Sequence, residues 1–146
     1  FSILKQKFMS KILVLCTGNS CRSQMAHGYL SKFLPDYQIY SAGTKPEPVN
    51  KFAVKVMKEE NIDISKNTSN HITDYEKINF DYVFTVCDNA KENCPIHLKF
   101  TKKKIHQSFF DPAKATGSDD EKISVYINVR NEIKFFLEKF ISENNL

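Results

Sequence analysis

A cysteine and an arginine with a spacing suited to oxyanion chemistry lie near the start of the sequence. Cys16 follows the apolar residues 12–15, Arg22 comes six positions later, and a helical pattern begins at Ser23. A buried strand, a tight loop and a helix N-terminus are expected in that order, so backbone N–H groups and the positive end of the helix dipole meet in the loop. Such a loop is a cradle for anions, and an arginine can donate two hydrogen bonds to a tetrahedral oxyanion.

The same positive potential favours the thiolate of Cys16, because it lowers the pKa of a thiol. We therefore predict that Cys16 attacks the central atom of a phosphate-like oxyanion held by Arg22 and the loop. The alternative is a small buried cysteine beside an unrelated surface arginine, which the Cys-x5-Arg-Ser spacing at a strand–helix junction disfavours. Cys21 is either a back-up thiol or a packed loop cysteine, and we favour the packed cysteine. The residues expected to form the oxyanion-binding loop are Thr17, Gly18, Asn19, Ser20, Cys21 and Ser23.

Asp111 is the candidate general acid. An attacked oxyanion must lose an oxygen, and a positioned carboxylic acid that protonates this oxygen contributes roughly 10²–10⁴-fold in rate. Asp111 follows a predicted strand, and Pro112 stiffens its loop. The alternative is an ordinary Asp-Pro turn, and the two interpretations are evenly balanced.

Two further cysteines, Cys87 and Cys94, indicate redox chemistry, since an oxyanion hydrolase of this type needs only one. If Cys16 carries a covalent adduct, a second thiol can attack it, release a reduced product and leave a disulfide. A third thiol can then take over that disulfide by thiol–disulfide exchange. The alternative of two cysteines buried as apolar residues is disfavoured by the polar residues 88–93 between them.

A zinc site made by all four cysteines is a further alternative. The spacing between Cys87 and Cys94 is long for zinc, and zinc leaves the pair Arg22-Ser23 unexplained. The histidines show no ligand spacing, and we interpret each as a surface residue or a satisfied polar group. We therefore predict no metal centre; the histidines are His27, His71, His97 and His106.

Strands alternate with helices along the chain, which predicts an α/β fold with three layers (α/β/α) around a four-stranded parallel sheet. Strands are expected over residues 11–15, 38–42, 81–86 and 105–110, and helices over 23–34, 50–60 and 118–142. Shorter helical segments are expected over 73–76, capped by Thr73 or Asp74, and over 88–93. Lys102, Lys103 and Lys104 are expected in a solvated turn. Ligands in such sheets bind beyond the carboxyl ends of strands, where Cys16, Cys87 and Asp111 are all expected.

The length of 146 residues suits one domain, and we expect residues 11–146 to be a single catalytic domain. Residues 1–10 are expected to be an N-terminal extension, either an added remnant or an ordered arm. The net charge of +4 suits an anionic substrate without arguing for nucleic acid, and no apolar stretch reaches the roughly 20 residues of a membrane span. Cysteines without a secretion signal indicate a reducing cytoplasm, and we expect a monomer.

These residues resemble the thioredoxin-coupled arsenate reductases, which share the fold of low-molecular-weight protein tyrosine phosphatases. The loop is common to both branches, whereas the set of Cys16, Cys87 and Cys94 is specific to the reductases. Gln24, where phosphatases usually have proline, and Ala113, near where they carry an aromatic residue, also favour the reductases. The resemblance covers residues 11–140, with matching motifs at 15–26, 40–43, 62–65, 85–87, 94–95, 110–113 and 129–133.

The resemblance implies a cycle in which Cys16 attacks arsenate and Asp111 protonates the departing oxygen. Cys87 then attacks Cys16 and frees arsenite, Cys94 attacks Cys87, and thioredoxin reduces the resulting disulfide. Ser23 would hydrogen-bond the Cys16 thiolate, and Asn19 would hold the shape of the loop. Two rivals remain: a phosphatase acting on phosphotyrosine or small phosphate esters, and a non-catalytic module that senses oxidants. Weak phosphatase activity is compatible with the first interpretation, and no tightly bound cofactor is expected.

One feature of the resembling family is altered here. Many of its members bind potassium beside the loop through asparagine, serine and two acidic residues. Asn19 and Ser41 match, but His27 and Asn70 stand at the acidic positions. A hard cation loses its main charge partners without those carboxylates, so we expect weak or no potassium dependence.

Overall fold

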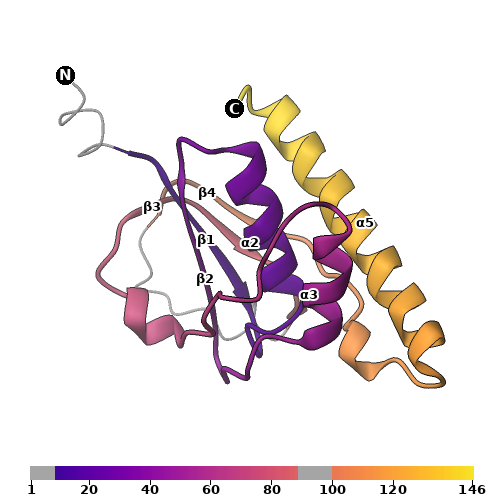
Figure 1. Cartoon of the computed structure of the whole chain (residues 1–146). Coiled ribbons are helices and arrows are strands. Elements are labelled where there is room, and N and C mark those ends of the chain that lie inside the picture. Colours follow the sequence, from indigo (N-terminus) through magenta and orange to yellow (C-terminus); the bar gives the residue numbers. More distant parts are fainter. Residues whose placement is uncertain (1–8, 89–99) are drawn as a thin grey trace.

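The sheet that positions the site is four-stranded and entirely parallel. The computed structural model describes residues 9–88 and 100–146. Neighbouring strands pair in the order β2-β1-β3-β4 (Figure 1), which confirms the predicted α/β class and parallel sheet. The strands are β1 (Lys11–Cys16), β2 (Gln38–Gly43), β3 (Phe80–Thr85) and β4 (Phe100–His106).

The central strand β1 explains why the sheet is covered on both faces. Residues 12–15 are at most 1% exposed, as expected of an apolar run that contacts neighbours on both faces of a parallel sheet. On one face, the Phe140 ring lies 5.2 Å from Tyr82 and 4.9 Å from Phe84. On the other, Tyr75 lies 5.1 Å from Tyr40. The sheet is therefore packed between two outer layers.

Three α-helices contact one another on the Phe140 side of the sheet (Figure 1). A short 3-10 helix, η1, lies on the Tyr40 side, and a second, η2, connects β4 to the last helix. Of the helical segment expected over residues 88–93, all but Asp88 lies outside the described residues. The helices are α2 (Arg22–Phe33), α3 (Lys51–Lys58), α5 (Asp119–Glu143), η1 (Ile72–Tyr75) and η2 (Pro112–Lys114).

The helix α5 begins at a capping box, in which Ser118 and Glu121 satisfy each other's backbone N–H groups. Its buried face includes a charged residue, Arg130, which is 8% exposed. The guanidinium of Arg130 donates to Val56 O at 2.9 Å and to Glu59 Oε1 at 3.1 Å. A buried charge is tolerated when it is paired in this way, and the pairing ties α5 to the C-terminal end of α3. The apolar residues Ile123, Ile127 and Ile141 of the same helix are only partly buried.

The prediction for the last strand was wrong. The strand β4 ends at His106, whereas residues 105–110 were expected to form it. The three lysines expected in a solvated turn are exposed and lie within β4. Because β4 pairs only with β3 among the described strands, it is the edge strand of this sheet, and edge strands accommodate lysine. The charge of these residues had obscured the strand pattern.

The cap of η1 was also predicted wrongly. His71 occupies the N-cap position, where its Nδ1 accepts a hydrogen bond from Thr73 N at 3.1 Å. Thr73 and Asp74, the expected caps, lie inside the helix. Histidine is an uncommon cap, so the sequence favoured the hydroxyl and carboxylate side chains instead.

Candidate active site

The loop after β1 is held between a buried strand and a helix start. Cys16 ends β1 and is 3% exposed, and α2 begins at Arg22. In the described part of the chain, no side chain caps this helix, so its first N–H groups stay available beside the loop. The structure thus contains the predicted order of strand, loop and helix.

Asn19 fixes the shape of the loop from beneath. It has a φ of 50°, a left-handed conformation that asparagine tolerates better than most residues, and it is fully buried. Its side chain donates to Ser23 Oγ at 2.8 Å and accepts from Asn70 N at 2.9 Å. Gln24 Nε2 donates to Asn19 O at 3.0 Å, so the backbone of Asn19 is held as well. Ser23 is thereby placed beside Asn19, under the loop.

The structure brings Cys87 to Cys16. Cys87 is 4% exposed, follows β3 by two residues, and has its Sγ 3.3 Å from Thr17 Oγ1. The hydrogen bond with Cys87, followed by burial, raises the pKa of Cys16 well above its usual value. Arg22 and the Thr17 backbone N–H act in the opposite direction. The neighbouring thiol and burial together therefore outweigh the positive field that the sequence led us to expect. Cys94 lies outside the described residues.

Arg22 keeps one donor unused. Its Nη1 donates to Phe109 O at 3.0 Å, and its Nη2 lies 3.6 Å from Asp111 Oδ2. Its Nε is buried and has no hydrogen-bond partner among residues 9–88 and 100–146. A buried donor without a partner costs about 1–3 kcal/mol of stability. A bound oxyanion that accepts a hydrogen bond from Arg22 Nε would offset this cost.

Asp111 reaches the site by a different route from the expected one. It lies five residues beyond β4, at the N-cap of η2, where its Oδ1 accepts from Ala113 N at 3.1 Å. Residues 107–110 between them run beside the end of β3, since Gln107 N donates to Thr85 O at 3.0 Å and Phe109 N to Val86 O at 3.2 Å. These contacts bring the carboxyl group to Arg22.

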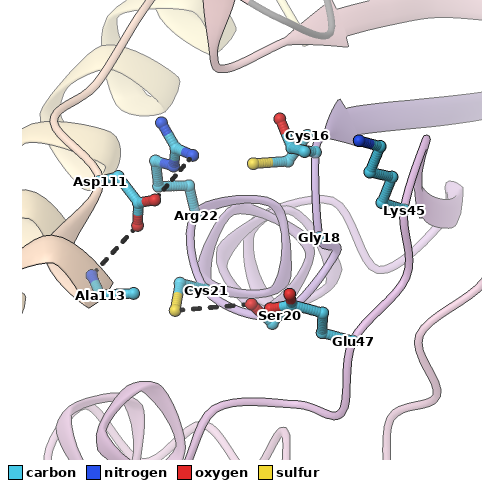
Figure 2. Close-up of a pocket in the computed structure, with 10 residues that line it drawn as sticks. Cys16, Gly18, Ser20, Cys21, Arg22, Lys45, Glu47, Asp111 and Ala113 are labelled. Carbon is cyan, nitrogen blue, oxygen red and sulfur yellow. Dashed lines mark hydrogen bonds and ion pairs between the residues drawn. The ribbon is translucent and has the colours of Figure 1, made fainter.

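These side chains surround a cavity of about 170 Å³ (Figure 2). Asn19 and Ser23 support the loop from behind, and the other expected loop residues line the cavity. Lys45 and Glu47 also line it and were missed, although they follow the end of β2 as the other site residues follow their strands. The lining residues are Cys16, Thr17, Gly18, Ser20, Cys21, Arg22, Lys45, Glu47, Asp111 and Ala113.

Cys21 is packed and yet lines the cavity. It is 4% exposed, with its Sγ 3.8 Å from Tyr126 Oη and 3.7 Å from Ser20 Oγ. Burial raises the pKa of its thiol. Its environment therefore favours the protonated form, as expected of a packed cysteine.

The four residues that correspond to the family's potassium site form hydrogen bonds with one another or with neighbouring residues; they are Asn19, His27, Ser41 and Asn70. Asn19 Oδ1 accepts from Asn70 N, and the Asn70 side chain donates to Thr68. Ser41 Oγ is hydrogen-bonded to His27 Nδ1 at 2.8 Å, and burial lowers the pKa of His27 to about 4. A neutral imidazole and two amides offer a cation no charge, so this set does not fit potassium. Within the described ranges, no cluster of three histidine, cysteine or acidic residues could hold a metal ion.

Comparisons with known proteins give two related groups. The family model described as "Low molecular weight phosphotyrosine protein phosphatase" matches residues 11–144. An "Arsenate reductase" of Halalkalibacterium halodurans is 49% identical over 84% of this chain and 88% of its own length. Another "Arsenate reductase", of Bacillus subtilis, is 45% identical over 88% of this chain and 93% of its own length.

Solved structures fall in the same two groups. "An arsenate reductase in the phosphate binding state" superimposes with a TM-score of 0.78 at 29% identity, covering 92% of this chain and 98% of that one. A low molecular weight protein tyrosine phosphatase from T. tengcongensis superimposes with a TM-score of 0.73 at 25% identity, covering 92% and 99%. Both likenesses extend over nearly the whole fold.

Proposed function

This chain belongs to the low molecular weight phosphotyrosine protein phosphatase family and, within it, to the arsenate reductases, and from this premise we propose that three cysteines carry its reaction. The activity is the reduction of arsenate to arsenite. The observation that carries the proposed relay is the position of Cys87, which is buried beside the oxyanion loop with its Sγ 3.3 Å from Thr17 Oγ1, close enough to Cys16 to raise the pKa of that thiol. A hydrolase needs no second thiol at that place.

In the first step, Cys16, whose raised pKa keeps it protonated before arsenate binds, passes its proton to an oxygen of the bound arsenate, and the resulting thiolate attacks the arsenic atom. Arg22 Nε, buried and unpaired among the described residues, and the loop N–H groups hold the oxygens. A sulfur–arsenic bond forms and an arsenic–oxygen bond breaks, and the departing hydroxyl takes the proton of Asp111 to leave as water. The Arg22–Asp111 contact of 3.6 Å places that carboxyl group beside the held anion.

In the second step, Cys87 attacks the sulfur of Cys16. The sulfur–arsenic bond breaks and its electron pair stays on arsenic, so arsenic(V) becomes arsenic(III) and leaves as arsenite. The two sulfurs are oxidised to a disulfide, and the Cys87 proton passes to an arsenite oxygen. Thr17 Oγ1, 3.3 Å from Cys87 Sγ, holds the attacking sulfur near the loop.

In the third step, Cys94 attacks Cys87, frees the Cys16 thiolate and forms a Cys87–Cys94 disulfide. Thioredoxin, a dithiol protein, then reduces this disulfide and becomes oxidised itself. Both Cys94 and the choice of thioredoxin come from the family resemblance, because Cys94 lies outside the described residues.

Weak hydrolysis of phosphate esters is proposed as a side activity. The loop and Arg22 would hold phosphate as they hold arsenate. The lining of the cavity contains no aromatic side chain from the described ranges, so an aryl group has no ring to stack on. Phosphotyrosine is therefore a poor substrate in this proposal.

We further propose that the enzyme works in the cytoplasm as a monomer without a resident cofactor, and that potassium is not required. None of the described helices is long and apolar enough to cross a membrane. The mutual contacts of Asn19, Ser41, His27 and Asn70 support independence from potassium, because they hold the underside of the loop without a cation.

The proposal is tested by following NADPH consumption with thioredoxin and thioredoxin reductase, with and without arsenate. Wild type is expected to consume NADPH only with arsenate. Cys94→Ser is expected to release about one arsenite per chain and then stop, with Cys16 and Cys87 joined. Cys21→Ser removes a thiol outside the relay, and although its KM can change because Cys21 lines the cavity, it should release many arsenites per chain. Sustained turnover by Cys94→Ser, or aryl phosphate cleavage with no arsenate-dependent consumption, would refute the relay.

A further inference from the structure

The segment after β2 is fastened along the oxyanion loop by backbone hydrogen bonds. Lys45 N donates to Thr17 O at 2.9 Å, and Glu47 N donates to Gly18 O at 2.8 Å. Asn50 N donates to Ser20 O at 3.0 Å, just before α3 begins. The backbone of Lys45 and Glu47 is thus fixed to the loop, so their side chains emerge at defined places on its rim.

Both side chains border the cavity and carry opposite charges. Figure 2 shows Lys45 running along the rim toward Cys16, with Glu47 lying over the part of the loop formed by Gly18 and Ser20. A Cβ on Gly18 would lie 3.4 Å from Glu47 Oε2, which puts the carboxylate against the loop. Both residues are exposed, and neither forms an ion pair within the described part of the chain.

The charges around the cavity leave Lys45 with a role that Arg22 does not fill. Asp111 already faces Arg22 at 3.6 Å, and Glu47 adds a second negative charge beside the loop. An incoming oxyanion meets these carboxylates as well as the cations. Lys45 is the cavity's second cation, and no carboxylate among the described residues neutralises it.

We propose that Lys45 and Glu47 set the affinity of the site for its oxyanion, Lys45 by attracting the anion and Glu47 by opposing it. This inference rests on the proposed function of the loop as the oxyanion site. Exposed charges act through solvent, so their effect is moderate and falls with salt, as the Debye length shrinks to about 3 Å at 1 M. The pair changes binding rather than chemistry, because neither side chain donates or accepts a proton in the reaction.

The test is the binding of inorganic phosphate, measured by calorimetry on the reduced protein at low salt and at about 1 M salt. Phosphate is not reduced, so the result does not depend on the relay. At low salt, Lys45→Gln is expected to weaken binding about five-fold and Glu47→Gln to strengthen it about three-fold, as moderate Coulomb terms at a solvated rim. Lys45→Arg should bind within about two-fold of wild type, since it keeps the charge.

Two controls separate this role from a structural one or a general charge effect. Lys55→Gln removes an exposed positive charge from α3 and should leave phosphate affinity unchanged. At about 1 M salt, the difference between Lys45→Gln and wild type should fall below two-fold. In arsenate turnover, Lys45→Gln should raise KM about five-fold and leave kcat within two-fold.

The outcomes are distinguishable. The inference is overturned if wild type binds phosphate and Lys45→Gln binds it equally well, or if the two glutamine variants change affinity in the same direction. A loss that is the same at both salt concentrations would also overturn it, because it would indicate a distorted loop. If wild type itself binds no phosphate, the oxyanion site fails and this inference fails with it. If phosphate binding follows the expected pattern without arsenate turnover, only the relay fails.

Discussion

Replacing Gly43 by alanine tests how tightly the oxyanion loop is held. A Cβ at Gly43 would lie 2.4 Å from Thr17 O and 3.0 Å from Asn19 N, both backbone atoms of the loop. Thr17 O would have to move by about 0.6 Å to reach even the 3.0 Å limit of real contacts. It also accepts the hydrogen bond from Lys45 N, so the movement strains the rim as well.

The replacement is expected to lower both activity and stability. Catalytic groups tolerate displacements of only about 0.5 Å, and a misplacement of 1 Å costs about 10²-fold in rate. We therefore expect Gly43→Ala to lower kcat/KM for arsenate roughly 10- to 100-fold. Overpacking typically lowers the free energy of unfolding by about 1–3 kcal/mol, and urea unfolding of Gly43→Ala measures this loss.

Gly28→Ala is the matched control. A Cβ at Gly28 would lie 2.9 Å from Ile62 Cγ2 and 3.1 Å from Met57 Cε, which are side-chain methyl groups away from the loop. We expect a loss of stability with kcat/KM for arsenate near that of wild type. If Gly43→Ala keeps wild-type kcat/KM, the loop is not held as tightly as these contacts imply, and the reasoning from loop geometry is refuted.

Three further predictions concern Asp111, His27 and potassium. Asp111→Asn should lower kcat about 10²-fold while phosphate binds at least as tightly, because the general acid is lost and Arg22 is released from a carboxylate at 3.6 Å; an unchanged kcat would remove Asp111 from the mechanism. The pKa of His27 is lowered by burial to about 4, below the 6.5 of an unfolded chain, so the unfolded state binds more protons between these values. Stability should therefore be full above about pH 6.5 and fall by up to about 3 kcal/mol as the pH drops to 4, and His27→Gln should remove this slope in urea unfolding. Replacing sodium chloride by potassium chloride should leave both kcat and the melting temperature unchanged, because the hydrogen bond between His27 and Ser41 takes the place of a bound cation. Several-fold activation by potassium would contradict this explanation.

The sequence predicted those parts of the fold that depend on local patterns. The buried run before Cys16, the helix after it and the capping box at Ser118 each carry their own signal in neighbouring residues. The last strand was misplaced because Lys102 to Lys104 look like a solvated turn, and only the strand's position at the sheet edge makes them acceptable. The burial of Arg130 was not predicted for a similar reason, since its partners, Val56 on α3 and Glu59 just after that helix, are 74 and 71 positions away in the chain.

The site shows the same division between local and distant information. Cys16 and Arg22 could be recognised because the loop motif is continuous, whereas Lys45 and Glu47 belong to the site through backbone hydrogen bonds with Thr17 and Gly18. Backbone groups are nearly the same in every residue, so the pattern of side chains in the sequence does not predict such hydrogen bonds. The loop motif supplies the cradle, and the chain after β2 supplies its rim. It follows that relatives with the same loop but different residues at positions 45 and 47 should bind the same oxyanion with different affinity and salt dependence. Exchanging these two side chains between relatives and measuring oxyanion affinity would test this directly.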